Sequence, residues 1–179
     1  MKKRQIVIIK ADDCTGWRAN WPKFISIIKK YNIKAGVGII GKGLAEAPET
    51  DVAYLRENFI KEYIEFWNHG WTHWSHPEHY NTPDTYEFKG RPCAEQYSAL
   101  LNTQKIIQKR LNRQCRTFGE PHNRFDQNTC NALHQLPEMK VWLGWNNQLS
   151  SKKFILNINS YLEEGWPGRI HFVNFFDDN

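Results

Sequence analysis

Four of the chain's seven histidines lie within eleven positions, in the segment WNHGWTHWSHPEHY at residues 67–80. His69 and His73 are four residues apart, a spacing that on a helical turn would place both imidazoles on one face, as two-histidine metal sites require. His76 would extend that face and His79 falls nearby, although Pro77 disfavours one continuous helix through residue 79. A single surface histidine is usually inert, but four clustered at the end of a predicted strand favour a set of metal ligands.

A pair of adjacent carboxylates, Asp12 and Asp13, follows the apolar run QIVIIKA at residues 5–11. Neighbours in a strand point to opposite faces, so both carboxylates reach one site only where the strand breaks into a loop, as DDCTG allows. Two carboxylates in one place repel each other unless a cation lies between them, and a divalent metal would remove that conflict. The alternative, which stays open, is that either aspartate only caps the following segment.

Two imidazoles and one carboxylate, with positions left open to water, are typical of a hydrolytic metal site; a structural site would have four protein ligands. A water in the open position has its pKa lowered toward neutrality, and the second carboxylate of the pair can take its proton. Zn²⁺ suits this ligand set best, while Co²⁺, Ni²⁺, Fe²⁺ and Mn²⁺ also accept it.

The elements that must position these residues alternate between strand and helix. Apolar runs predict strands at 5–11, 33–40, 62–68, 140–146, 153–158 and 169–176, with a further strand end at 115–121. Helical periodicity covers 21–31, 49–60, 93–113 and 126–135. This alternation predicts an α/β fold with a mainly parallel sheet or barrel, and the absence of a linker or repeat predicts one domain over 1–179. The clusters at 11–13, 68–73 and 118–123 follow strands and are expected around one rim.

Composition argues against several other classes of protein. The net charge of +5 is scattered, and the basic stretch at 104–116 is interpreted as the solvated face of a helix, so nucleic-acid binding is not expected. The four cysteines are far apart and form no CxxC pair, which argues against a thiolate zinc site and a disulfide scaffold. The N-terminal apolar run is too short for a secretory signal or a membrane span, so a cytoplasmic protein is expected.

Two segments resemble motifs of the polysaccharide deacetylase family, the NodB-homology metal hydrolases. IIKADD is similar to the first motif, a strand followed by TFDD, and FWNHGWTHWSH is similar to the second, typically GNHTWSHP. The resemblance implies a distorted (β/α)7 barrel, with Asp12 as catalytic base and with Asp13, His69 and His73 as metal ligands. By order and spacing of motifs it spans about the first 125 residues, and it leaves His76 and His79 as lining or surface residues.

The third motif departs from the family pattern R-x-P-Y. TFGEPHN keeps Pro121 but has Gly119 where the family has arginine and His122 where it has tyrosine. In the family the arginine orients the base, so that support must come from elsewhere in this chain or be missing. The backbone N–H of His122 can still stabilise an oxyanion, because that role needs no particular side chain.

The later motifs leave the proton donor open. The family has an Asp-Trp pair, whereas KVWLGWNN has Trp142 and Trp145 without an aspartate. The family's general-acid histidine follows an apolar run near the end, whereas His171 starts that run in RIHFVNFFDDN. His122 and His171 are the two candidates for the acid, and either can instead be an ordinary packed or exposed histidine.

The expected function is removal of an N- or O-acetyl group from a carbohydrate, such as an amino sugar in a cell-surface polysaccharide precursor. Pro121, His122, Trp71 and Trp74 are the predicted substrate-binding residues; Trp17 and Tyr80 also suit stacking against a sugar. Two alternatives stay open. One is a carbohydrate- or metal-binding protein that has lost catalysis, and the other is a metal hydrolase of a different C–N bond.

Overall fold

The computed structural model describes residues 6–14, 21–60, 63–74, 84–144, 154–155, 160–161 and 170–175, with side chains in 9–14, 21–59, 63–74 and 84–144. The strands are β1 (Ile6–Cys14), β2 (Ala35–Ile39), β3 (Ile64–Asn68), β4 (Thr117–Phe118), β5 (Val141–Trp142), β6 (Phe154–Ile155), β7 (Ser160–Tyr161) and β8 (Ile170–Phe175). The helices are α1 (Trp21–Lys30), α2 (Gly41–Glu46), α3 (Glu49–Ile60), α4 (Cys93–Leu111) and α5 (Gln127–His134), with a 3₁₀ turn, η1 (Pro121–Asn123).

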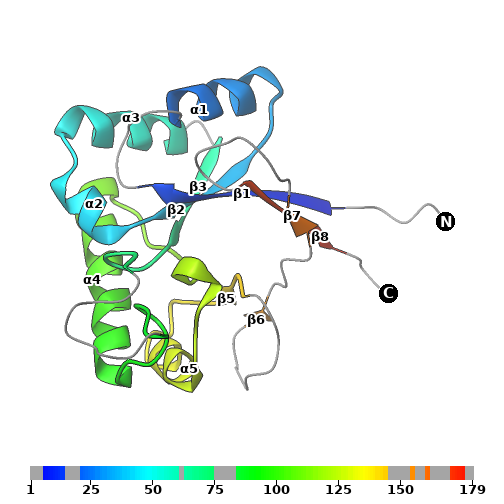
Figure 1. Cartoon of the computed structure of the whole chain (residues 1–179). Helices are drawn as coiled ribbons and strands as arrows, with labels where there is room; N and C mark the ends of the chain where they lie inside the picture. The colour runs from blue at the N-terminus through cyan, green and yellow to red at the C-terminus, as the bar shows by residue number, and fades with distance from the viewer. Residues whose placement is uncertain are drawn as a thin grey trace.

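The strands form one sheet in the order β6-β5-β4-β3-β2-β1-β8-β7. Neighbours from β1 to β6 are parallel, whereas β8 is antiparallel to both β1 and β7. Helices α1 and α3 lie together on one side of β1 to β3, and α4 runs beside the sheet toward α5 (Figure 1). The predicted α/β class with a mainly parallel sheet is therefore confirmed.

The predicted helices and the strands β1, β2, β3 and β8 form close to their expected bounds, whereas β4 and β5 are shorter than predicted, with two residues each. Helix α4 ends two residues before the predicted end, because Asn112 adopts a left-handed conformation (φ 53°) that closes the helix. Helix α2 and strand β7 were not predicted; both are short, six and two residues long, and leave little periodicity to detect. None of the helices in the described chain combines the length and the apolar character that a bilayer crossing requires.

Strand β1 corrects one expectation at the aspartates. The chain does not leave the sheet there, because β1 continues through Cys14, which pairs with Ile39 of β2. The register shifts between Ala11 and Cys14, and Asp13 has a positive φ of 65°. Such a bulge re-aims side chains without ending the strand. It lets two consecutive carboxylates serve the same region of the molecule.

The outward face of β1 to β3 forms the larger apolar core against α1, α3 and the end of α4. Val37 and Ile39 of β2 are completely buried there, together with Phe66 of β3. A second core cluster, which includes Phe88, Leu100, Phe118, Leu133 and Trp142, lies between α4, α5, β4 and β5. The two cores hold the first four parallel strands in place, so the loops after them project from a rigid frame.

Candidate metal and catalytic site

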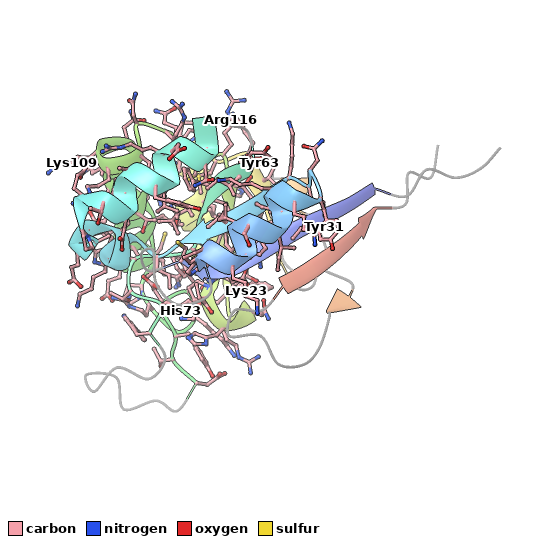
Figure 2. All side chains as sticks on the ribbon, turned by 90° about the horizontal axis from the view of Figure 1, so that it is seen from above. Lys23, Tyr31, Tyr63, His73, Lys109 and Arg116 are labelled. Carbon is pink, nitrogen blue, oxygen red and sulfur yellow. The ribbon has the colours of Figure 1, made fainter. Side chains whose placement is uncertain are left out.

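Three predicted ligands converge at the carboxyl ends of β1 and β3. The Oδ1 atom of Asp13 lies 3.2 Å from His69 Nε2 and 2.8 Å from His73 Nε2. One donor atom from each residue can be chosen so that all three lie within 4.8 Å of one another. Figure 2 shows His73 on the opposite side of the molecule from Arg116 and Tyr63, which directly precede β4 and β3. The group is thus at the end of the parallel strands where α/β folds place their sites.

The histidine segment differs from the expected helical turn. Residues 69–74 form no helix, and both Gly70 (φ 78°) and His73 (φ 56°) have left-handed backbones. A Cβ at Gly70 would lie 2.6 Å from Glu87 Oε2, so only glycine fits without displacement. The two imidazoles meet because the chain curls back after β3, and not because they share a helix face.

Glu87 holds this curl in place. Its buried carboxylate accepts backbone hydrogen bonds from Trp71 (2.7 Å), Thr72 (3.0 Å) and His73 (2.8 Å). Three donors converging on one carboxylate fix the backbone that carries His73. The sequence reasoning missed Glu87 because it lies fourteen residues beyond His73 and outside any motif-like spacing.

The site's own hydrogen bonds suit it to a cation. His69 Nδ1 lies 2.7 Å from the carbonyl of Gly119, to which it can donate, so that Nε2, 3.2 Å from Asp13 Oδ1, would be available to coordinate a bound cation. This is the tautomer that metal-bound histidines adopt, with the second nitrogen held by a backbone acceptor. His69 is buried, whereas the Asp13 side chain is 46% exposed, so one side of the group remains open to solvent. Two imidazole nitrogens and a carboxylate oxygen therefore fit a divalent ion with an open position.

The electrostatics of the triad follow from the same contacts. Burial alone would raise the pKa of Asp13, but the hydrogen bonds and charges of His69 and His73 outweigh it and hold that pKa well below its usual range. Burial likewise opposes the charged form of His73, but the bond and charge of Asp13 raise the pKa of His73. Asp13 and His73 thus stabilise each other's charged forms at the place where a bound cation would balance the carboxylate.

Asp12 shares the cavity of the triad. The cavity has a volume of about 190 Å³ and is lined by Asp12, Asp13, His69, His73, Glu120, His122 and Asn123. Asp12 is 8% exposed, and its Oδ2 lies 3.2 Å from Nζ of Lys10, which is 2% exposed. The adjacent carboxylates therefore differ: Asp13 faces two imidazoles, and Asp12 faces a buried ammonium group.

His122 lies at the rim of the same cavity, in η1 after β4. Its ring centroid is 4.3 Å from that of His73, and its Nε2 lies 3.2 Å from the His73 carbonyl. Burial and the charge of His73 lower the pKa of His122. Its backbone is left-handed (φ 59°), and the preceding Pro121 is buried. These positions are compatible with the predicted roles of His122 and Pro121, which remain predictions.

Other predicted site residues lie elsewhere or outside the described chain. Trp71 and Trp74 line a second cavity of about 350 Å³ beside α4, where the Arg91 guanidinium lies 4.8 Å from the Trp74 ring centroid. Their role in substrate binding stays a prediction. His171 pairs in register with Lys10 across β1 and β8, but its side chain is outside the described part. Trp17, His76, His79, Tyr80 and Trp145 also fall outside the described residues.

Three further residues around the site were not singled out in the sequence. Glu120 is buried and accepts a 2.6 Å hydrogen bond from Nε1 of Trp142, which ties the cavity wall to β5. Lys10 and Trp67 lie beneath Asp12 and His69. Lys10 had a detectable signal, because it lies two residues before Asp12 in a strand and must share its face.

The fold and the Asp–His–His group at its rim define the class of polysaccharide deacetylases. The sequence profile described as Polysaccharide deacetylase matches residues 1–140, and the chain belongs to that family. None of the curated proteins compared with the chain is significantly similar to it in sequence.

Solved structures agree on the fold. A CE4 family pseudoenzyme from Bacillus anthracis matches with a TM-score of 0.57 at 19% identity, over 76% of this chain and 41% of that one. A de-N-acetylase from Aggregatibacter actinomycetemcomitans matches with a TM-score of 0.61 at 17% identity, over 82% and 67%. A family 4 acetyl xylan esterase from Clostridium thermocellum, in complex with a cobalt ion, matches with a TM-score of 0.55 at 18% identity, over 75% and 55%. The fold is the predicted distorted barrel, and this chain spans about two fifths of the pseudoenzyme's length.

Proposed function

We propose that this chain is a metal-dependent hydrolase that removes an acetyl group from a carbohydrate, with an N-acetylated amino sugar as the expected substrate. Membership of the polysaccharide deacetylase family supports the reaction class. The observation that carries the metal dependence is the convergence of Asp13, His69 and His73 beside Asp12 in one cavity open to solvent. Zn²⁺ is the ion that best suits these ligands, and Co²⁺, Ni²⁺, Fe²⁺ and Mn²⁺ are the alternatives.

Asp13, His69 and His73 would hold the cation. When bound, the cation would polarise the acetyl carbonyl and lower the pKa of a coordinated water. Asp12 would accept the proton of the attacking water, since its carboxylate lines the same cavity and its Oδ2 is tethered by Lys10. The backbone N–H of His122 is the proposed donor to the oxyanion. His122 and His171 are the candidates that would protonate the leaving amine.

Two observations also favour a second candidate function. Position 119 is glycine where the family has arginine, and one of the matching structures is a pseudoenzyme. A protein that binds metal or carbohydrate without turnover is therefore the competing proposal. Substitution of Asp12 distinguishes the two proposed functions, because a catalyst needs the Asp12 carboxylate and a binding protein does not.

The decisive experiment measures acetate release by the zinc- and cobalt-loaded protein. Substrates are N-acetylglucosamine oligomers, N-acetylated sugar nucleotides and O-acetylated xylan; fluorescamine detection of free amines separates N- from O-deacetylation. Asp12→Asn should lose about 10²- to 10⁴-fold in turnover while keeping its metal. Asp51→Asn, on α3 away from the cavity, is the matched control and should behave as wild type. Absence of acetate from every substrate, with full metal occupancy, would favour the binding protein.

A further inference from the structure

The floor beneath the site is a single indole, that of Trp67 in β3. A Cβ at Gly38 would lie 2.4 Å from this ring, one at Gly119 would lie 2.6 Å from it, and one at Gly36 would lie 3.3 Å from it. Two positions in β2 and the residue that follows β4 thus carry no side chain where the indole crosses them. The His69 ring stands against the same indole at 4.8 Å between centroids, in an edge-to-face arrangement.

This floor explains why residue 119 cannot carry a base-orienting side chain. The distance of 2.6 Å to Cζ3 of Trp67 is shorter than real Cβ contacts allow, and the obstacle is a rigid buried ring. An arginine at 119 would have to displace Trp67 and, with it, the surface against which His69 packs. The cation that faces Asp12 has to come from another strand.

Lys10 supplies that cation from β1. Its Nζ lies 3.2 Å from Oδ2 of Asp12 and 4.7 Å from the centroid of the Trp67 ring. Lysine at 10 and aspartate at 12 share the inner face because they are two residues apart in a strand. The Lys10 side chain is 2% exposed, so the aromatic face and the carboxylate replace the water around its ammonium group. These two contacts place the charge of Lys10 against the Asp12 carboxylate.

We propose that Lys10 is the positioning residue for Asp12. Trp67 fills the space that a side chain at position 119 would need, and its ring holds Lys10 beside Asp12. This inference rests on the proposed function of Asp12 as the base. Lys10 fixes one carboxylate oxygen and thereby the direction in which the carboxylate faces the cavity. Lys10 itself does not line that cavity and touches no reacting atom. Its effect on the reaction passes through Asp12.

The test compares Lys10→Met, which keeps the length and removes the charge, with Lys10→Arg, which keeps the charge. Lys10→Met should lower kcat by about 10- to 100-fold, because a displaced base loses alignment, while KM and the bound zinc stay unchanged. Lys10→Arg should recover most of that loss. In an Asp12→Asn background, measured at high enzyme concentration, Lys10→Met should cause no further loss.

The double substitution distinguishes positioning from a structural defect. A fold defect would lower kcat by the same factor in both backgrounds, and that result would overturn the inference. Wild-type kcat in metal-loaded Lys10→Met would overturn it as well. Should Lys10→Met not fold, Lys10→Leu, which also removes the charge and every N–H donor from position 10, is measured in its place with the same expectations.

A second readout does not depend on turnover. In crystal structures, the Asp12 carboxylate should turn away from its wild-type rotamer in Lys10→Met and keep it in Lys10→Arg. An unchanged rotamer in Lys10→Met would overturn the inference. If the wild-type protein released no acetate, the proposed function would fail, and the rotamers would still decide the role of Lys10.

Discussion

The two faces of strands β1 to β3 are built on different principles. The outward face carries Val37, Ile39 and Phe66, which pack among many other apolar side chains of α1 and α3. The inward face carries Lys10, Asp12 and Trp67, each of which has a specific polar or aromatic contact there. The alternation of a strand assigns consecutive residues to these two environments.

The contrast predicts how each face responds to change. A hydrocarbon core distributes its stabilisation over many weak contacts, so it tolerates a smaller side chain at a moderate cost in free energy of unfolding. A polar site depends on a few directed contacts, so one lost partner changes function more than stability. Substitutions on the two faces should therefore separate activity from stability.

The largest effect is expected from the triad itself. Asp13→Ala, His69→Ala and His73→Ala each remove one of three protein ligands, so zinc binding by calorimetry and acetate release should both fall below detection. His134→Ala, on the exposed end of α5, is the matched histidine control and should retain both. A His73→Ala protein that still bound one zinc ion tightly would remove His73 from the ligand set.

Glu87→Gln should have the next largest effect. The carboxylate accepts three backbone N–H groups with its two oxygens, so in either orientation the new amide NH₂ group would face at least one N–H donor. The loop that carries His73 should loosen, and zinc affinity should fall by about 10- to 100-fold.

The control for Glu87 is Glu49→Gln, which removes an exposed carboxylate paired with Arg56. Surface pairs of this kind contribute about 0 to 1 kcal/mol, so this protein should match wild type in zinc affinity. Equal zinc affinities for the two variants would show that the loop needs no help from Glu87.

These contacts mark what the sequence could and could not reveal. Apolar periodicity was sufficient for most helices and strands, because those elements depend on one apolar face each. The residue types in DD and HxxxH indicated the triad. The helical turn at His69 to His73 was wrong, since Gly70 and His73 take left-handed backbones around Glu87, a partner far along the chain. The exclusion of a side chain at 119 depends on Trp67 of another strand, which only the folded arrangement brings near.

Gly119→Ala tests the close packing against the Trp67 ring beneath the site, and its expected effect is smaller. The added methyl group would lie 2.6 Å from Trp67 Cζ3, and overpacking of this kind costs about 1 to 3 kcal/mol in free energy of unfolding. Because Trp67 also contacts Lys10 and His69, kcat should fall as well. Gly36→Ala meets the same ring at 3.3 Å and is the graded comparison, with a smaller loss of both. Denaturant unfolding and acetate release measure the two effects, and a more stable Gly119→Ala would contradict the crowding.

Ile39→Val tests the outward face, where one methylene is removed from a completely buried side chain. The expected loss is about 0.5 to 1.5 kcal/mol in free energy of unfolding, with kcat and zinc affinity unchanged. A drop in kcat without a drop in stability would show that the two faces are coupled through β2, and the contrast between them would fail.

The smallest effect is a pH dependence confined to the inner face. The pKa of Asp13 is lowered from its ordinary 3.8, so its contribution to stability is present above that pH and is lost as the pH falls further. The pKa of His73 is raised above its ordinary 6.5, so its contribution is present below pH 6.5 and is lost as the pH rises through the raised value. In the metal-free protein this pair should therefore stabilise the fold most between about pH 4 and pH 6.5.

A zinc ion should reverse the second slope. Zinc competes with the proton on His73, so its binding and the stability it adds increase as the pH rises from 5 toward 8. Thermal unfolding of the metal-free and zinc-saturated proteins over this range should thus show opposite trends above pH 6.5, and Asp13→Asn should flatten both. Parallel trends would mean that the proton and the zinc ion do not compete for His73. That result would contradict the proposed metal site.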